Sequence, residues 1–281
     1  MTLRITTICE NTADRHSLLG EWGLSILVET DEGNILLDTG GGLSVVHNAR
    51  ALRVKLGKID KIVLSHGHRD HTGGLRSILK RVERGVEIIA HPDAFQPKYS
   101  SGKSHRHRFA GIPFQIEELE SLGARLNITR EPVKISERVM TTGEVPMVTE
   151  FEQVDARLHV KKPSGWTPDT VMDDQSLIIK TEYGLVVILG CAHRGIINHL
   201  RHIQNIAGTP EIYAVIGGCH LFNASKDRIQ KTIQALKSMN VRKLGVSHCT
   251  GMEASVMMAK ALGDRFFFNN AGTVIKIPEE K

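Results

Sequence analysis

The stretch Lys61-Ile62-Val63-Leu64-Ser65-His66-Gly67-His68-Arg69-Asp70-His71-Thr72-Gly73-Gly74 carries the strongest signal in the chain. Its apolar, β-branched beginning predicts a short buried strand. Three imidazoles and a carboxylate follow the strand within six consecutive positions. Alternate side chains of an extended segment point the same way, so we expect His66 and His68 to bind one metal ion together. Asp70 and His71 lie beyond the turn and are expected to bind a second ion beside the first.

The ligand types indicate which cofactor to expect. Imidazole and carboxylate suit zinc, and also manganese, magnesium or iron, so we predict one or two divalent metal ions with zinc as the first candidate. Gly67, Gly73 and Gly74 let the backbone bend close to the ions. The alternative is a solvated polar loop. A strand that ends in His-x-His-x-Asp-His before two glycines is far more specific than a lone histidine.

Composition limits the class of protein. A chain of 281 residues can bury a large core in one α/β domain or two small ones. No apolar run is long enough to span a bilayer, and the N-terminus lacks the layout of a signal peptide, so we expect a cytoplasmic protein with no membrane partner. The four cysteines form no Cys-x-x-Cys pair, which argues against a zinc ribbon or a disulfide scaffold. The net charge of +5 is compatible with phosphorylated substrates or nucleic acid.

Predicted strands and helices alternate in both halves of the chain. The strands are expected at 4–10, 24–29, 34–38, 61–64, 86–90, 176–181, 185–189, 212–216, 243–246, 266–268 and 273–277. The helices are expected at 43–56, 76–84, 116–126, 196–206, 226–239 and up to 262. The pattern predicts one α/β domain over 1–281, with halves of roughly 1–92 and 172–281 and a less regular insertion at about 94–170.

Many of the predicted strands end in residues that could bind a metal, and α/β architectures gather function at such strand ends. These strand-end residues are Asp38, His66, His68, His91, Cys191, His193, Cys219, His220 and His248. His66 and His68 need at least one further ligand, and we expect His193 to complete that site. Asp70, His71 and His248 are expected to bind the other ion.

Two strand-end residues have alternative roles. Asp38 could hydrogen-bond a metal-binding imidazole or the loop backbone, or it could be an ordinary turn aspartate. His91 could enter the metal site, although a structural role is the simpler interpretation.

The histidine-rich stretch resembles the signature of the metallo-β-lactamase superfamily, whose members bind one or two metals in an αββα sandwich. That resemblance implies a four-layer α/β fold with the metal site at the strand ends, and it implies that Asp38 supports the ligands from behind. Other stretches resemble a narrower group, the 7,8-dihydropterin-6-yl-methyl-4-(β-D-ribofuranosyl)aminobenzene 5′-phosphate synthase family. They are Trp22-Gly23-Leu24-Ser25, Leu37-Asp38-Thr39-Gly40, Gly190-Cys191-Ala192-His193-Arg194-Gly195-Ile196-Ile197-Asn198, Gly217-Gly218-Cys219-His220-Leu221 and Ser247-His248-Cys249-Thr250-Gly251.

The chain departs from the superfamily pattern at Cys191, which follows Gly190 where the superfamily usually has a bridging aspartate. Cys191 could bind or bridge metal as a thiolate, or the second site could be weak. Asp173 or Asp174 could compensate. We expect Asp70, Cys191 and His220 to be catalytic, with His220 meeting substrate rather than metal.

The narrower resemblance implies a transferase of methanopterin biosynthesis that joins a dihydropterin diphosphate to an aminobenzene ribofuranosyl phosphate and releases pyrophosphate. The basic stretch 96–109 could bind the phosphate through Lys103, Arg106 and Arg108, or it could be a solvated surface loop. Trp22 is a further candidate for substrate binding. Trp166, in a Pro/Gly-rich loop predicted at 161–169, could line a site or anchor that loop.

Several rival functions share these features. A metallo-hydrolase of a phosphoester, lactone or thioester would use the same ligands and a metal-bound water. An iron redox protein is a further alternative, because Cys191 and Cys249 could bind iron. The histidine at position 68, where a flavo-diiron type of site has a carboxylate, argues against that type. A nuclease or nucleic-acid binder is disfavoured by the small charge excess and the lack of a recognition motif. A non-catalytic binding module is the weakest rival. A homo-oligomer is compatible with the sequence.

Overall fold

A computed structural model describes residues 3–102 and 106–278 of the chain. The contacts between residues divide the chain into two compact units. The first unit comprises Met1–Thr129, Ala156–Asp169 and Asn270–Lys281, and the second comprises Arg130–Asp155 and Thr170–Asn269. The grouping of both units into one domain stays a prediction.

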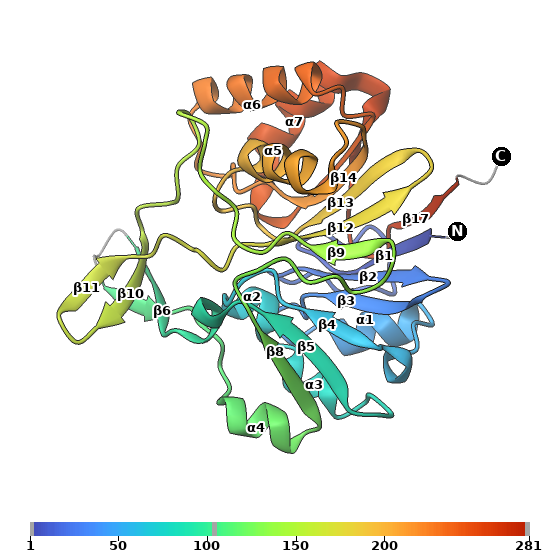
Figure 1. Cartoon of the computed structure of the whole chain (residues 1–281), viewed down its shortest axis with the longest axis vertical. Helices are drawn as coiled ribbons and strands as arrows, with labels where there is room; N and C mark the ends of the chain where they lie inside the picture. Colours follow the sequence, from blue (N-terminus) through green and yellow to red (C-terminus); the bar gives the residue numbers. More distant parts are fainter. Residues whose placement is uncertain (1–2, 103–105, 279–281) are drawn as a thin grey trace. The chain divides into compact units, whose positions relative to one another are not determined.

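A seven-stranded sheet with the order β17-β1-β2-β3-β4-β5-β8 forms the centre of the first unit (Figure 1). Its strands are β1 (Leu3–Cys9), β2 (Ser25–Thr30), β3 (Gly33–Leu37), β4 (Lys61–Val63), β5 (Val86–Ala90), β8 (Ala124–Ile128) and β17 (Val274–Ile277). The strands from β17 to β3 pair antiparallel, whereas those from β3 to β8 pair parallel. The parallel part places the ends of β3, β4 and β5 at one edge, where the histidine-rich loop begins.

Short helices connect the parallel strands of this sheet. They are α1 (Val45–Ala51), α2 (Arg69–Thr72), α3 (Leu75–Leu79) and α4 (Ile116–Ser121). Apolar residues at helical spacing on α3 pack against alternate residues of the strands, so that Ile62, Ile78 and Ile88 share one buried core. This core supports β4, the strand that leads into the loop.

A separate four-stranded sheet with the order β11-β10-β6-β7 also belongs to the first unit. Its strands are β6 (Lys98–Ser101), β7 (His107–Phe109), β10 (Leu158–Lys162) and β11 (Gly165–Pro168). Its core contains an ion pair between Lys98 Nζ and Asp169 Oδ2 at 2.9 Å. The loop predicted at 161–169 is therefore wrong, because these residues form most of a β-hairpin that pairs with β6.

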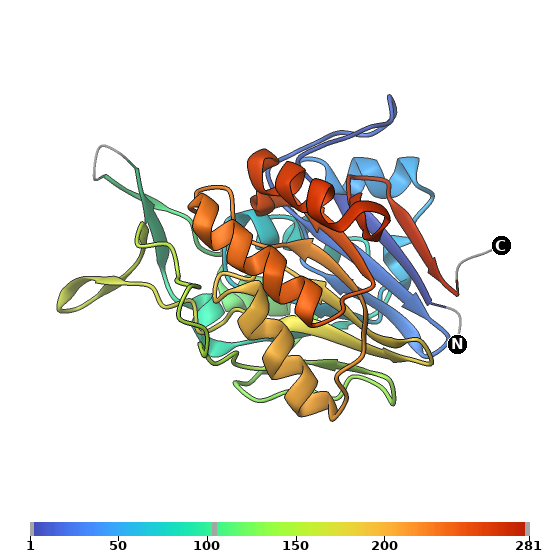
Figure 2. The same ribbon diagram turned by 90° about the horizontal axis from the view of Figure 1, so that it is seen from above.

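A six-stranded sheet with the order β16-β15-β14-β13-β12-β9 forms the second unit. Its strands are β9 (Val139–Thr141), β12 (Ser176–Thr181), β13 (Gly184–Leu189), β14 (Ile212–Gly218), β15 (Lys243–Ser247) and β16 (Phe266–Phe268). Helices α5 (Ile196–Ala207), α6 (Lys226–Ser238) and α7 (Met252–Leu262) cover one face of this sheet (Figures 1 and 2). Leu200, Ile229 and Met258 pack their apolar faces against Val187 and Val215 of the strands.

Most predicted elements of the second unit are confirmed, including the Ser225 N-cap, whose hydroxyl accepts a hydrogen bond from Arg228 N. Two helices predicted in the first unit need correction. The helix expected at 43–56 ends at Ala51, and Arg53 adopts the left-handed conformation with φ 58°. The helix expected at 116–126 ends at Ser121, since the following residues extend into β8 beside β5. The two C-terminal strands belong to different sheets, β16 to the six-stranded sheet and β17 to the seven-stranded one.

The mixed α/β class is confirmed. Within the described residues, no helix has both the length and the apolar character that a membrane crossing requires.

Candidate metal centre

The histidine loop, defined here as residues 65–71, follows β4 in the first unit. The ring centroids of His66 and His68 lie 4.6 Å apart, and those of His66 and His71 lie 4.2 Å apart. Asp70 and His71 belong to the short helix α2, and Asp70 Oδ2 lies 4.0 Å from His71 Nε2. The loop therefore gathers three imidazoles and one carboxylate in one place, as predicted from their spacing.

Asp38 supports this loop from the end of β3. Its side chain accepts hydrogen bonds from Ser65 N at 2.7 Å, Ser65 Oγ at 2.6 Å and His71 Nδ1 at 2.6 Å. Because Nδ1 of His71 donates to a carboxylate, its Nε2 keeps the lone pair that a metal needs. Ser65 Oγ lies 2.9 Å from His66 Nδ1 and, having donated to Asp38, can accept from that ring. Of the two roles considered for Asp38, the structure therefore supports hydrogen bonding to the loop over an ordinary turn aspartate, and Asp38 contacts both an imidazole and the loop backbone.

The chain packs tightly around the histidine loop. A Cβ on Gly67 would lie 2.0 Å from the carbonyl oxygen of Ala94, so no other residue fits there without movement. Arg69 N donates to the carbonyl oxygen of Ala110 at 2.7 Å. The segment that carries β6 and β7 thus begins and ends against the histidine loop.

His91 has a structural role in the fold. Its Nδ1 accepts a hydrogen bond from Asp93 N at 3.0 Å and so caps the 3₁₀ helix Pro92–Phe95. This contact favours the simpler of the two interpretations of His91 from the sequence.

The second unit gathers its own set of ligand-type side chains at the ends of three parallel strands, β13, β14 and β15. Cys191, His248 and Cys249 bring one ligand atom each to within 4.8 Å of one another, and so do Cys191, His193 and His220. Ala192, His220 and His248 have φ values of 50°, 45° and 51°. Non-glycine residues rarely adopt this conformation, and such strain clusters at functional sites.

Electrostatic interactions link His220 and Cys249. His220 N donates to Cys249 Sγ at 3.3 Å, and His220 Nε2 lies 3.8 Å from Asp155 Oδ2. Burial lowers the pKa of His220, but Asp155 and Cys249 outweigh burial and raise the pKa to about 9. Burial raises the pKa of Cys249, but interactions with Cys191, His220 and His248 hold the pKa well below its usual range. Cys249 therefore becomes a thiolate more readily than an ordinary cysteine.

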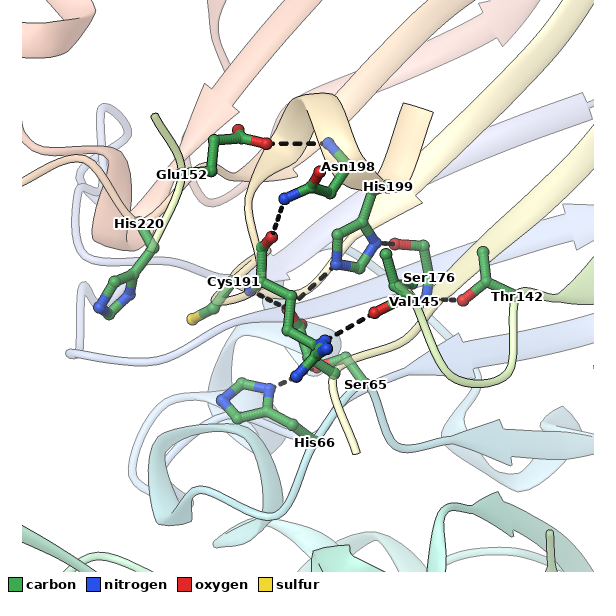
Figure 3. Close-up of polar contacts among 12 residues, drawn as sticks. Ser65, His66, Thr142, Val145, Glu152, Ser176, Cys191, Asn198, His199 and His220 are labelled. Carbon is green, nitrogen blue, oxygen red and sulfur yellow. Dashed lines mark hydrogen bonds and ion pairs between the residues drawn. The ribbon is translucent and has the colours of Figure 1, made fainter. Parts of the chain in front are cut away.

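A buried hydrogen-bond network fixes the loop that carries Cys191 and His193. Asp174 Oδ2 accepts from Arg194 N at 2.7 Å and lies 3.0 Å from His199 Nε2, while His199 Nδ1 lies 2.7 Å from Ser176 Oγ. Oδ2 of Asp174 is thus held by the Arg194 backbone and the His199 ring. Figure 3 shows His199 between Ser176 and this loop.

Glu152 fixes the start of α5, directly after the same loop. Its Oε1 accepts from Ile197 N at 2.9 Å. Its Oε2 accepts from Asn198 N, also at 2.9 Å (Figure 3). A carboxylate at a helix N-terminus satisfies free N–H groups and interacts favourably with the helix dipole. Asn198 Nδ2 donates back to the Arg194 carbonyl at 2.7 Å.

The residues predicted to bind substrate lie in different surroundings. Trp22 is 55% exposed. Arg106 is exposed directly before β7, and Arg108 is exposed within that strand. Lys103 lies outside the described residues. Trp166 stacks on His107 with a centroid distance of 3.8 Å, which supports its role as an anchor of the four-stranded sheet. Substrate binding by Trp22, Arg106 and Arg108 stays a prediction.

Sequence reasoning missed His199, Glu152 and Asp155 as supporting residues. His199 lies inside an amphipathic helix and Glu152 in an irregular segment, so neither had a neighbouring motif to mark it. The sequence suggested Cys249 only as a possible iron ligand. Its position directly after His248, a predicted metal ligand, could have identified it as a further candidate for metal binding.

Comparisons with known proteins cover almost the whole chain. The family model of the metallo-β-lactamase superfamily matches residues 23–248. The chain is 35% identical to a 7,8-dihydropterin-6-methyl-4-(β-D-ribofuranosyl)-aminobenzene-5′-phosphate synthase of Methanocaldococcus jannaschii, covering 98% of this chain and 96% of that protein. It is 32% identical to an uncharacterized protein of the same organism, over 97% of this chain and 100% of the other.

A solved structure resembles the chain along almost its full length. The structure of Tm1679, described as a metal-dependent hydrolase of the β-lactamase superfamily, superposes with a TM-score of 0.82 at 29% identity. The match covers 97% of this chain and 98% of that one.

Proposed function

Because the chain belongs to the metallo-β-lactamase superfamily, we propose that it is a metal-dependent enzyme that joins a 6-hydroxymethyl-dihydropterin diphosphate to an aminobenzene ribofuranosyl phosphate and releases pyrophosphate. The observation that carries this proposal is the 35% identity to the synthase over 98% of the chain. A reaction of cofactor biosynthesis fits a cytoplasmic enzyme with a small phosphorylated substrate.

The metal ligands we assign come from both ligand sets. His66, His68 and His193 would bind one ion. Asp70, His71 and His248 would bind the other, with Cys191 as a thiolate ligand of that second ion. The hydrogen bonds of Asp38 to His71 and of Ser65 to His66 support these assignments, because they leave Nε2 of each ring as the metal-binding nitrogen. The strand-end cluster of ligand atoms supports Cys191 and His248. Zinc is the ion we propose, since imidazole and thiolate ligands suit it together.

The proposed reaction forms one bond and breaks one. The amine nitrogen of the aminobenzene bonds to the methylene carbon of the dihydropterin, the carbon–oxygen bond to diphosphate breaks, and pyrophosphate leaves with the electron pair. The amine loses one proton in the same overall change. When bound, divalent ions supply stabilisation of the negative charge on the diphosphate oxygens.

The residues of this chain would position and bind the reactants. The Asp70 carboxylate could accept the amine proton. The ring N–H groups of His220 could donate to a diphosphate oxygen. Arg106 and Arg108 carry the guanidinium groups that suit the phosphate of the second substrate.

A hydrolase is the second candidate function, and the similarity to Tm1679 favours it, because that protein is described as a metal-dependent hydrolase. Hydrolysis of a phosphoester, lactone or thioester would use the same ligands, with water in place of the amine as the nucleophile.

Pyrophosphate release distinguishes the two functions. Zinc-loaded protein would be mixed with the dihydropterin diphosphate, with and without the aminobenzene ribofuranosyl phosphate. Release that requires the second substrate, together with the joined product by mass spectrometry, is the expected result. Release without the second substrate would favour the hydrolase, and no release with zinc, manganese, magnesium or iron would contradict the proposed reaction.

A further inference from the structure

We propose that Cys249 is a metal ligand, and that Cys249, Cys191 and His248 together form a metal site with two thiolates in the second unit. This inference rests on the proposed metal dependence of the enzyme and defines the chemistry of one of its ions. The assignment of Cys249 depends on the geometry of this chain.

The distances fit a single ion. The ligand atoms of Cys191, His248 and Cys249 lie within 4.8 Å of one another. Two sulfurs bound to one tetrahedral zinc ion, at Zn–S distances of about 2.3 Å, lie roughly 3.8 Å apart. The three atoms therefore need only a small contraction to share an ion, and all four cysteines of the chain are free rather than bonded in disulfides.

The backbone around Cys249 fixes the position of its sulfur atom beside Cys191 and His248. A Cβ on Gly218 would lie 2.7 Å from Cys249 Sγ, so the sulfur occupies space that any other residue would fill. His220 N donates to the same sulfur at 3.3 Å, a contact that favours the thiolate. His248, directly before it, has a φ of 51°, a conformation that costs energy and persists only where the surroundings enforce it.

Cys219 provides a contrast within the same cluster of strand ends. It is buried like Cys249, but burial, partly offset by a hydrogen bond with Thr250, raises its pKa to about 12. None of the groups of potential ligand atoms found among the described residues includes Cys219. It is therefore a matched control for Cys249.

Two thiolates select the type of ion. Thiolate ligands suit zinc, cobalt(II) and iron(II), whereas magnesium and manganese prefer oxygen ligands. We therefore expect this site to retain zinc in the presence of a large excess of magnesium.

Cobalt(II) is a direct probe of thiolate ligation, because cobalt–thiolate bonds absorb in the near ultraviolet. The full-length protein would be loaded with cobalt(II), and this absorption compared among the wild type and the Cys249→Ser, Cys191→Ser and Cys219→Ser variants. We expect the intensity to fall to about half in each of the first two variants, since each loses one of two thiolates. The Cys219→Ser variant should keep the wild-type intensity, and unchanged intensity in Cys249→Ser would overturn the proposal.

X-ray absorption of the zinc-loaded wild-type protein tests the same claim without any substitution. The number of sulfur neighbours per zinc ion is multiplied by the measured zinc content, and we expect two zinc–sulfur bonds per protein molecule at about 2.3 Å. One sulfur or none would overturn the proposal, even if the variants failed to fold. Neither readout depends on catalysis, so a protein that showed both signals without releasing pyrophosphate would contradict the proposed reaction and leave the thiolate site intact.

Discussion

Asp38 accepts a hydrogen bond from His71, with 2.6 Å between Oδ2 and Nδ1, and both side chains are fully buried. The same carboxylate accepts from Ser65 Oγ, which in turn contacts His66 Nδ1. One buried carboxylate thus fixes the ring orientation of two imidazoles, one directly and one through a hydroxyl group. Both rings are left with Nε2 as the nitrogen that can bind a metal.

The Asp38→Asn variant should bind zinc about 10–100-fold more weakly than the wild type, as loss of such supporting contacts usually does. Asparagine has nearly the same shape and also tolerates the φ of 59° at this position, but its amide nitrogen cannot accept a hydrogen bond. Competition with a chelating dye measures the affinity. The Asp60→Asn variant is the control, since Asp60 is exposed and its side chain accepts a hydrogen bond from Asn34 N at the start of β3. Equal affinities in the two variants would contradict this role of Asp38.

The glycines at the two ends of α5 offer a matched pair. Gly195 and Gly208 have φ values of 98° and 68°, so alanine is strained at both. Gly208, with ψ 24°, is in the left-handed α region, where alanine costs roughly 1–2 kcal/mol, whereas Gly195, with ψ 129°, lies outside that region. At Gly195 the new Cβ would also lie 2.3 Å from the Glu152 carboxylate carbon, whereas at Gly208 it meets nothing within 4 Å. Gly195→Ala should therefore lower the free energy of unfolding by at least about 1–2 kcal/mol more than Gly208→Ala, because it displaces the Glu152 cap and places alanine in a backbone conformation outside the left-handed α region.

Urea unfolding followed by circular dichroism compares the two glycine variants. Equal destabilisation by both substitutions would show that the Glu152 cap adds nothing to the stability of α5.

The parts of this protein that can be predicted from the sequence are those that a short, contiguous stretch of residues determines. The histidine loop is contiguous, the hairpin of β12 and β13 has its turn between two apolar runs, and α5 has a clear apolar face. The mixed α/β fold and the strand-end position of the candidate ligands follow from these elements.

Contacts between distant segments could not be predicted in the same way. Strand β10 pairs with β6 through Leu158 and Ser100, and no pattern within either segment indicates this partner. Glu152 and His199 act on a loop near residue 194 that they reach only through the fold. After α1 the chain turns through Arg53, which has the left-handed conformation. The spacing of apolar residues does not predict this conformation, so the end of the helix could not be predicted from it.

The buried ion pair of Lys98 and Asp169 should respond differently to single and double substitution. Lys98→Met leaves the Asp169 carboxylate buried without its cation, and we expect a loss of about 3–5 kcal/mol in the free energy of unfolding. The double variant Lys98→Met/Asp169→Leu should recover most of that loss, since two apolar side chains of similar volume replace the pair. Chemical denaturation of the three proteins tests this. A double variant as unstable as the single one would contradict the account.

His68→Ala should remove metal and activity without unfolding the protein. We expect pyrophosphate release to fall by at least about 100-fold together with the bound zinc, because one of the three proposed ligands of an ion is lost. His47→Ala is the control, as His47 is exposed and its Nε2 contacts the Ser17 carbonyl oxygen at 3.0 Å. Full activity and unchanged metal content in His68→Ala would contradict the assignment of the histidine loop.

The most direct test of the account is pyrophosphate release in the presence of both substrates, before and after removal of the metal. The protein would be treated with a chelator, its metal content checked by mass spectrometry, and zinc then restored. The account predicts that release disappears with the metal and returns with zinc. Release that continues at the same rate in protein shown to be free of metal would contradict it.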